Sequence, residues 1–173
     1  VKMLKKLANY LFAGLLCMSF VGCGEHDEVE DLDYDFTPIQ ICVMAESQDG
    51  KDLLNPDVDE NILTQNIVAT YRGKEYTNGK SSKSRVYVPH FYGLVTMKLN
   101  NGKYALAFGE LNGQEDFKNE ELVIDWGDGE QDVITFTSTV NWKGQRPEVK
   151  RSYQLNGKEV AKDTAMPIMK VVK

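Results

Sequence analysis

"TMKLNNGKYALAF" (residues 96–108) is the stretch that decides the fold class. Asn101-Gly102 at its centre favours a two-residue type I′ turn, because both central positions of that turn need a positive φ. With that loop the apolar residues of both arms share one face, and they pair as Leu99 with Tyr104, Met97 with Leu106 and Val95 with Phe108. A wholly apolar face is typical of a β-hairpin lying on a core.

The same pattern continues on both sides of this hairpin. "ATYRGKEYTN" (69–78) predicts a type II′ turn at Gly73-Lys74, which places Tyr71 opposite Tyr76. "SYQLNGKEVA" (152–161) predicts a turn at Asn156-Gly157, and this turn pairs Tyr153 with Val160 and Gln154 with Glu159. Further strands are expected at 39–45, 85–91, 120–126, 131–140 and 166–172, and the stretches 47–61 and 110–120 are expected to be loops. No helical period is found from Pro38 onward, so the chain is expected to fold as an antiparallel sandwich or barrel.

"DWGDGEQD" (125–132) is the candidate metal site, with three aspartates around a turn at Asp128-Gly129. A loop of two or four residues would set Asp125 directly opposite Asp132, where like charges repel. A basic side chain, water or a cation would then have to offset the repulsion, and Asp125, Asp128 and Asp132 could supply oxygens to Ca²⁺. A three-residue loop would instead pair Asp125 with Gln131, and the repulsion that a cation would offset would then be absent. The spacing is not that of an EF-hand, and a structural turn is the competing interpretation.

The N-terminal residues 1–22 have the pattern of a secretory signal peptide. Three lysines precede an apolar run of 15 residues from Leu7 to Val21, which is short of the roughly 20 residues that span a bilayer. "FVGC" (20–23) resembles a bacterial lipobox, which predicts that Cys23 is lipidated. An ordinary signal peptidase site, with Cys23 as an incidental thiol, is the alternative.

An acidic run follows Cys23 and leads into the folded part of the chain. "GEHDEVEDLDYDF" (24–36) carries seven acids and no lysine or arginine, so residues 23–37 are expected to form a flexible tether before a single domain at 38–173. The run also resembles the surface-export signal of lipoproteins of Bacteroidetes, although a solvated spacer would have the same composition.

Charge and cysteine content limit the partners of the folded part. The chain has 20 bases and 26 acids. Removing the three lysines of the signal and the seven acids of the tether leaves 17 bases and 19 acids, a balance that does not favour nucleic acid. Cys17 leaves with the signal and Cys23 is lipidated, so Cys42 has no partner for a disulfide. Cys42 alternates with apolar residues and is expected to be a buried strand residue rather than a nucleophile.

The chain resembles the small, largely uncharacterised surface lipoproteins of Bacteroidetes. The shared motifs are the lipobox, the acidic tether, a "DG.DLL.P" segment (49–56), a "Y.GK.Y" hairpin (71–76) and "DWGDG" (125–129), the last of which also resembles a turn of PKD-type domains. The resemblance implies an immunoglobulin-like β-sandwich at the outer membrane or cell surface, and it implies no known activity.

Two functions are consistent with these features. The first is a non-enzymatic binding module for a glycan or protein ligand, with the aromatics of "VPHFYG" (88–93) and Trp142 as candidate contacts. The second is a structural or assembly component that joins an envelope complex through an edge strand such as "MPIMKVVK" (166–173). An enzyme is not expected, because no catalytic triad, phosphate loop or Cys/His metal spacing occurs in the sequence.

Overall fold

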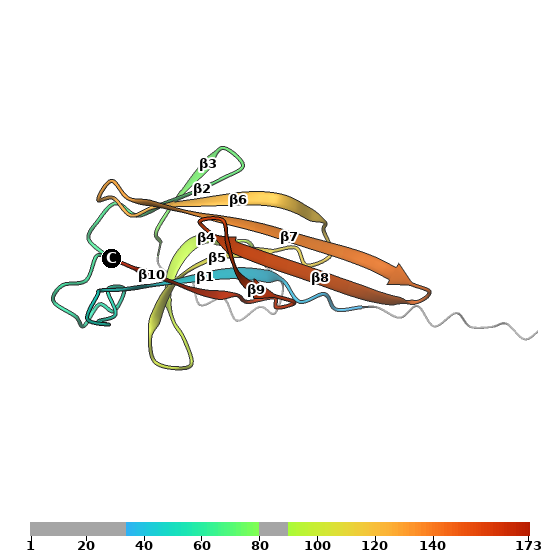
Figure 1. Cartoon of the computed structure of the whole chain (residues 1–173), viewed down its shortest axis with the longest axis horizontal. Helices are drawn as coiled ribbons and strands as arrows, with labels where there is room; N and C mark the ends of the chain where they lie inside the picture. Colours follow the sequence, from blue (N-terminus) through green and yellow to red (C-terminus); the bar gives the residue numbers. More distant parts are fainter. Residues whose placement is uncertain (1–33, 80–89) are drawn as a thin grey trace, which may run out of the picture. The chain divides into compact units, whose positions relative to one another are not determined.

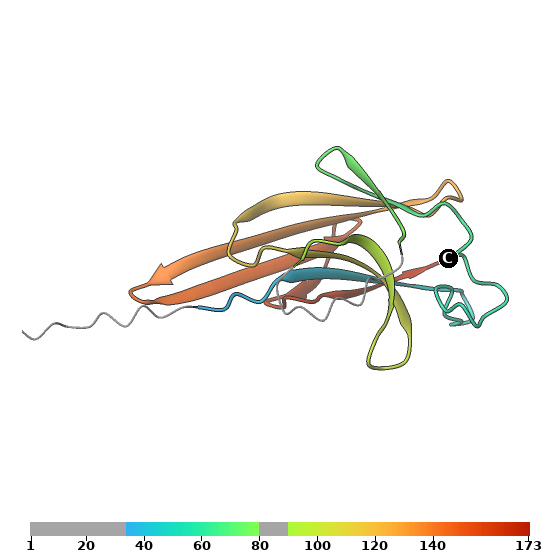
Figure 2. The same cartoon turned by 180° about the vertical axis from the view of Figure 1, so that it is seen from behind.

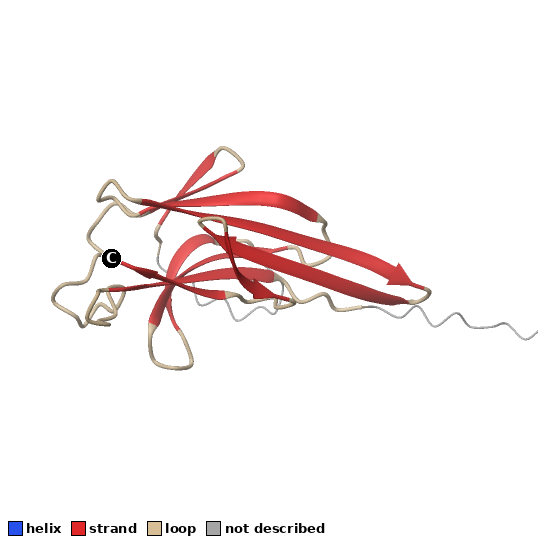
Figure 3. Cartoon of the chain, in the orientation of Figure 1, coloured by secondary structure: helices blue, strands red, loops and turns tan. Residues whose placement is uncertain are grey.

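The computed structural model describes residues 34–79 and 90–173. All regular secondary structure in these residues is β-strand (Figure 3). One sheet has the order β10 (Ile168–Val172), β1 (Ile39–Glu46), β5 (Tyr104–Leu111), β4 (Gly93–Lys98). The other has the order β3 (Lys74–Thr77), β2 (Val68–Tyr71), β6 (Phe117–Asp125), β7 (Gln131–Lys143), β8 (Arg146–Leu155), β9 (Lys158–Lys162). Only the pairing of β1 with β10 is parallel among these strands. The described part of the chain is therefore all-β, with two largely antiparallel sheets, as a β-sandwich requires.

The two sheets form two layers (Figures 1 and 2). One hydrophobic core draws its side chains from both of them. Alternate residues of each strand point into it, as the two-residue period of a strand dictates. Its largest members include Trp126, Phe108, Phe136 and Tyr153, all at most 1% exposed. Each such apolar side chain contributes about 1.5–3 kcal/mol on burial, so the facing sheets are held together mainly by this core.

The deciding hairpin forms at the predicted place, but its predicted register is wrong by one residue. Its loop contains three residues, with Gly102 at φ +85°, and the Leu99 N–H donates to the Lys103 carbonyl at 2.8 Å. The strands consequently pair Leu94 with Phe108, Val95 with Ala107, Thr96 with Leu106, Met97 with Ala105 and Lys98 with Tyr104. β5 presents the expected face to the core, whereas β4 is flipped. The error arose because both faces of β4 carry apolar residues, and those on the outer face join a second cluster around Cys42.

The two neighbouring hairpins also differ from prediction in detail. In the β2–β3 hairpin the turn is Arg72-Gly73, both at positive φ, so Tyr71 pairs with Lys74 instead of Tyr76. In the β8–β9 hairpin the turn is Asn156-Gly157 and Gln154 pairs with Glu159, both as predicted. A bulge then pairs Tyr153 with Ala161 rather than with Val160. Most of the predicted strand 85–91 lies outside the described residues, and its last two residues, which are described, are not in a strand. The expected loop 110–120 is shorter than predicted, because β5 extends into its start and β6 into its end.

The β7–β8 hairpin continues past the rest of its sheet (Figures 1 and 2). β6 pairs with β7 only as far as Ser138, whereas β7 and β8 pair with each other to Lys143 and Arg146. The chain segment 34–37 packs on this projecting part, with the Tyr34 and Phe36 rings 5.7 and 6.1 Å from the Trp142 ring. The last residues of the predicted tether (23–37) therefore contact the domain through two aromatic rings.

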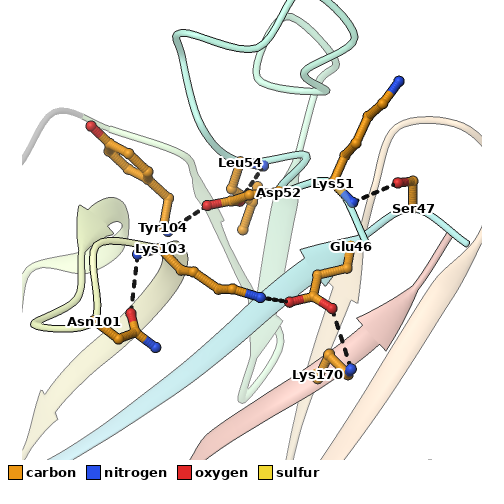
Figure 4. A network of polar contacts seen from close by, with 9 residues as sticks. All are labelled: Glu46, Ser47, Lys51, Asp52, Leu54, Asn101, Lys103, Tyr104 and Lys170. Carbon is orange, nitrogen blue, oxygen red and sulfur yellow. Dashed lines mark hydrogen bonds and ion pairs between the residues drawn. The ribbon is translucent and has the colours of Figure 1, made fainter. Parts of the chain in front are cut away.

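A buried glutamate at the opposite end of β1 joins this strand to β10 and to the loop before β5 (Figure 4). Glu46 is 6% exposed and forms ion pairs with Lys103 and with Lys170, the latter at 3.2 Å. Hydrogen bonds from these two lysines hold the pKa of Glu46 below its ordinary value, against the opposing effect of burial. Beside it, the Asp52 carboxylate accepts the Tyr104 N–H at 2.8 Å.

Candidate functional site

The acidic hairpin does not place Asp125 opposite Asp132, and that expectation is wrong. Its loop has three residues, Gly127 to Gly129, and closes with a bond from the Trp126 N–H to the Glu130 carbonyl at 3.2 Å. Asp125 therefore pairs with Gln131, and Ile124 pairs with Asp132. In this register Asp125 and Asp132 do not face each other, so no repulsion between them has to be offset.

Each carboxylate of the predicted calcium site binds protein donors instead. Asp125 accepts the Gly127 N–H at 2.8 Å and the Gln131 amide at 2.9 Å, and the bond from Gln131 is the main reason why its pKa is lowered. Asp132 accepts the buried Trp126 indole N–H at 2.7 Å and the Asn156 amide at 2.6 Å. Within residues 34–79 and 90–173 no group of three acidic, histidine or cysteine side chains is arranged to hold a metal ion.

A basic side chain lies at the tip of this hairpin. Lys173 Nζ is 2.9 Å from Asp128 Oδ2 and 2.8 Å from Glu130 Oε2, and it lies 5.1 Å from the centroid of the Trp126 ring. Burial acts to lower the pKa of Lys173, but the hydrogen bonds to Glu130 and Asp128 outweigh it and the pKa is raised. The hairpin thus fixes a core tryptophan and an ion cluster, which is a structural role.

Two of the predicted candidates that the structure describes, Cys42 and Phe91, pack against other side chains of the domain. Cys23 lies outside the described residues. Cys42 is fully buried in β1, and burial raises the pKa of its thiol to about 12, so it stays protonated and unreactive. Phe91 is 37% exposed and packs edge-on against Tyr76 and Phe108, with ring centroids at 5.4 and 5.3 Å.

Trp142, the other predicted aromatic contact, lies beside a cavity. Its side chain is 55% exposed near the end of β7, while Tyr34 and Phe36 contact it from the segment that precedes β1. The inner faces of β7 and β8 continue here beyond β6, and among the described residues segment 34–37 covers their apolar side chains. Between the two layers is a cavity of about 220 Å³ lined by Tyr34, Asp35, Phe36, Thr37, Pro147, Val149 and Arg151.

Arg151 is the cationic group of this cavity, and its sequence position did not identify it as a candidate. Its side chain is on the inner face of β8, and the residue is only 9% exposed. Nε donates to Ser138 Oγ at 3.3 Å and Nη2 donates to the Thr37 carbonyl at 3.0 Å. Both acceptors are neutral, and no carboxylate of the described residues forms an ion pair with the guanidinium. Burial accordingly lowers the pKa of Arg151.

A glycine keeps Arg151 and Thr37 in position. A β-carbon added at Gly113 would lie 2.3 Å from the Thr37 carbonyl oxygen and 3.2 Å from Arg151 Nη2. The loop after β5 can therefore approach the cavity only with glycine at this position.

A larger groove on the outer face of β2 and β6 contains a second arginine. Its volume is about 440 Å³, and Arg72 and Glu120 both line it. The Arg72 guanidinium binds both oxygens of Glu120, at 2.8 and 2.7 Å. This arginine is already neutralised, so the smaller cavity at Arg151 is the stronger candidate for a ligand site.

The cavity can hold an anion against apolar walls. An arginine fork binds planar anions through paired hydrogen bonds, and aromatic rings beside it provide flat apolar surfaces. Arginine stays protonated in proteins, so this group can bind an anion but cannot exchange a proton with it.

Comparisons of the chain with protein families, with curated proteins and with solved structures gave no match. None of the described residues forms a helix that is long and apolar enough to cross a membrane. The site must therefore be interpreted from its own geometry.

Proposed function

We propose that the chain is a lipid-anchored lipoprotein of the outer membrane or cell surface, and that its β-sandwich is a non-enzymatic binding module for a glycan or protein ligand. The observation that carries the proposal is the cavity at Arg151, which combines a buried guanidinium with aromatic walls beside the exposed Trp142. We also propose that this β-sandwich is immunoglobulin-like, as the resemblance to surface lipoproteins of Bacteroidetes implies.

The lining of the cavity supports binding rather than catalysis. Its cationic group does not transfer protons, and Tyr34 and Asp35 are the remaining lining residues with a group that can ionise. Rings that are half-exposed and already packed on one another offer contact area at a low cost in side-chain entropy, which suits recognition.

A binding screen tests the module. The full-length chain, purified in detergent, is applied to a glycan array and to a panel of extracellular-matrix proteins, together with the Trp142→Ala variant. We expect a selective, saturable signal that Trp142→Ala weakens and that Val160→Ala, an exposed apolar residue on β9, leaves unchanged. Flat responses of the wild-type chain on both panels would reject the binding module.

A pair of cysteine variants tests the lipid anchor. Cys23→Ala is expected to move the protein from the membrane fraction to the soluble fraction and to abolish labelling with palmitate. Cys17→Ala, six residues earlier within the predicted signal, is the matched control and should change neither. Retention of Cys23→Ala in membranes, with labelling intact, would contradict the lipoprotein assignment.

A second candidate function is that of an envelope assembly component joined through β10. This strand lies at the edge of its sheet, with outward-facing Ile168 and Val172 that are 48% and 59% exposed. Edge strands can add a strand from a partner. A double variant, Ile168→Lys with Val172→Lys, should then release co-purifying envelope proteins. A wild-type chain that elutes as a strict monomer with no partner would count against this function.

A further inference from the structure

The guanidinium of Arg151 carries a charge that the described fold does not neutralise. Arginine has five N–H donors, and hydrogen bonds to Ser138 and Thr37 engage two of its nitrogens, both with neutral acceptors. Buried charges are normally paired, because removal from water without a counter-ion is costly. Arg72, by contrast, donates from Nε and Nη2 to the two carboxylate oxygens of Glu120, although its side chain is more than half exposed.

We propose that the cavity at Arg151 binds the carboxylate of an acidic sugar residue, such as a uronic acid at the end of a glycan. The inference rests on the proposed binding function and names its ligand class. The carboxylate would supply the missing counter-ion, and the sugar ring would lie against the aromatic side chains at the mouth of the cavity.

The charge around the cavity favours a singly charged planar anion. Asp35 lines the same cavity and is exposed, and it makes no ion pair with Arg151. A doubly charged phosphate would meet stronger repulsion from Asp35 than a carboxylate, which carries one charge. The guanidinium fork also matches the planar geometry of a carboxylate, with two parallel hydrogen bonds.

The size and walls of the cavity favour one sugar residue over a longer ligand. Its volume of about 220 Å³ is below the roughly 300–1,000 Å³ of sites that enclose a drug-sized molecule. Tyr34 and Phe36 form part of its wall and pack edge-on against Trp142, which keeps more than half of its surface exposed. The C–H groups on the face of a pyranose ring can pack on such rings, while an aspartate or glutamate side chain of a peptide offers no comparable flat face.

Calorimetric titration of the full-length chain in detergent tests the inference. The probes are methyl β-D-glucuronide, methyl β-D-glucoside, glucose 6-sulfate, glucose 6-phosphate and a short acidic peptide. We expect the glucuronide to bind at least tenfold more tightly than the glucoside, the sulfate and the phosphate. Arg151→Lys and Arg151→Met should each weaken glucuronide binding at least tenfold, because lysine lacks the fork and methionine lacks the charge.

Arg146→Met is the matched control, since it removes an exposed arginine from the same hairpin. It should leave the affinity for glucuronide unchanged, whereas Trp142→Ala, at an exposed position that the core does not need, should weaken it. Equal affinities for glucuronide and glucoside, or equal losses in Arg146→Met and Arg151→Met, would overturn the inference. Tighter binding of the acidic peptide, the sulfate or the phosphate would overturn the assignment to a sugar carboxylate.

The proposed function and this inference fail in different ways. An array on which the chain binds neutral glycans but no acidic ones would leave the binding module intact and reject the carboxylate site. An array and protein panel without any signal would reject both.

Discussion

Replacing Arg151 by methionine should leave the stability of the domain almost unchanged, although the residue is 9% exposed. Methionine keeps the apolar stem and removes the guanidinium. A buried arginine that belongs to a structural ion pair would behave differently, because its removal strands the partner charge. The variant therefore tests whether the charge of Arg151 is free.

The magnitude follows from the contacts of the guanidinium. Losing its two hydrogen bonds, one of them long at 3.3 Å, and stranding the fully buried Ser138 hydroxyl cost about 2–4 kcal/mol. Removing a charge from a low-dielectric site recovers about 1–4 kcal/mol. The two contributions nearly cancel, so we expect the unfolding free energy of Arg151→Met to lie within about 1 kcal/mol of wild type.

Two companion variants make the prediction sharper. Adding Ser138→Ala to Arg151→Met removes the stranded hydroxyl and should restore about 1 kcal/mol. Arg151→Ala removes the stem as well and should cost about 2–4 kcal/mol through the space it leaves. The exposed Arg146→Met should stay within about 0.5 kcal/mol of wild type.

Urea unfolding at pH 7, followed by far-ultraviolet circular dichroism and extrapolated to zero denaturant, measures these free energies. A loss of about 3–5 kcal/mol in Arg151→Met would be the signature of a broken buried ion pair. That result would refute the argument that an external anion is needed to neutralise Arg151.

Three further changes test other parts of the structure. Because the pKa of Glu46 is lowered in the fold, its ion pairs should stabilise the domain above its unfolded pKa of about 4.3 and cease to do so as the pH falls through its lower folded value. The difference in melting temperature between wild type and Glu46→Gln should accordingly vanish at low pH, and a constant difference would contradict the assignment. Gly113→Ala should cost about 1–3 kcal/mol and weaken ligand binding, because its β-carbon would lie 2.3 Å from a carbonyl oxygen; Gly79→Ala, which meets its nearest atom at 3.8 Å, is the control in the same unfolding assay. Trp126→Phe should lower the free energy of unfolding in urea by about 1–3 kcal/mol, because it leaves the Asp132 carboxylate without its indole donor. The exposed Trp142→Phe is the control, and equal losses in the two variants would argue against that bond.

Local sequence patterns predicted the strands better than their registers. The turn at Asn156-Gly157 was predicted correctly, because a turn with two residues at positive φ is a local requirement that this dipeptide meets. The register at Asn101-Gly102 was wrong because the same dipeptide also fits a three-residue loop, with only Gly102 at positive φ. Where both faces of a strand are apolar, as in β4, the pattern cannot choose between these loops.

The pairing of distant segments was beyond the reach of local patterns. The parallel contact between β1 and β10 joins residues at opposite ends of the domain, and nothing in either strand specifies it. The basic partner of the acidic hairpin was anticipated as a kind of group, but Lys173 was not identified, because it comes from a separate strand end.

The candidate site was predictable only in part. Trp142 was identified as an aromatic that could contact a ligand, and it is exposed beside the cavity. Arg151 was missed, although Val149, Arg151 and Tyr153 alternate on one face of β8, and an arginine on an apolar face is a signal that the sequence offered. Arg151 has no carboxylate partner among the described residues, but this depends on the tertiary structure and cannot be predicted from the strand pattern.

The most direct test of the central claim is the NMR signal of the Arg151 Nε–H group during titration with methyl β-D-glucuronide. The signal is assigned by its absence from the spectrum of Arg151→Lys. If a carboxylate binds this guanidinium, the signal should shift in a saturable way with the affinity measured by calorimetry, while that of Arg146 stays in place. A signal of Arg151 that does not move at saturating glucuronide would contradict the claim that this cavity is the binding site.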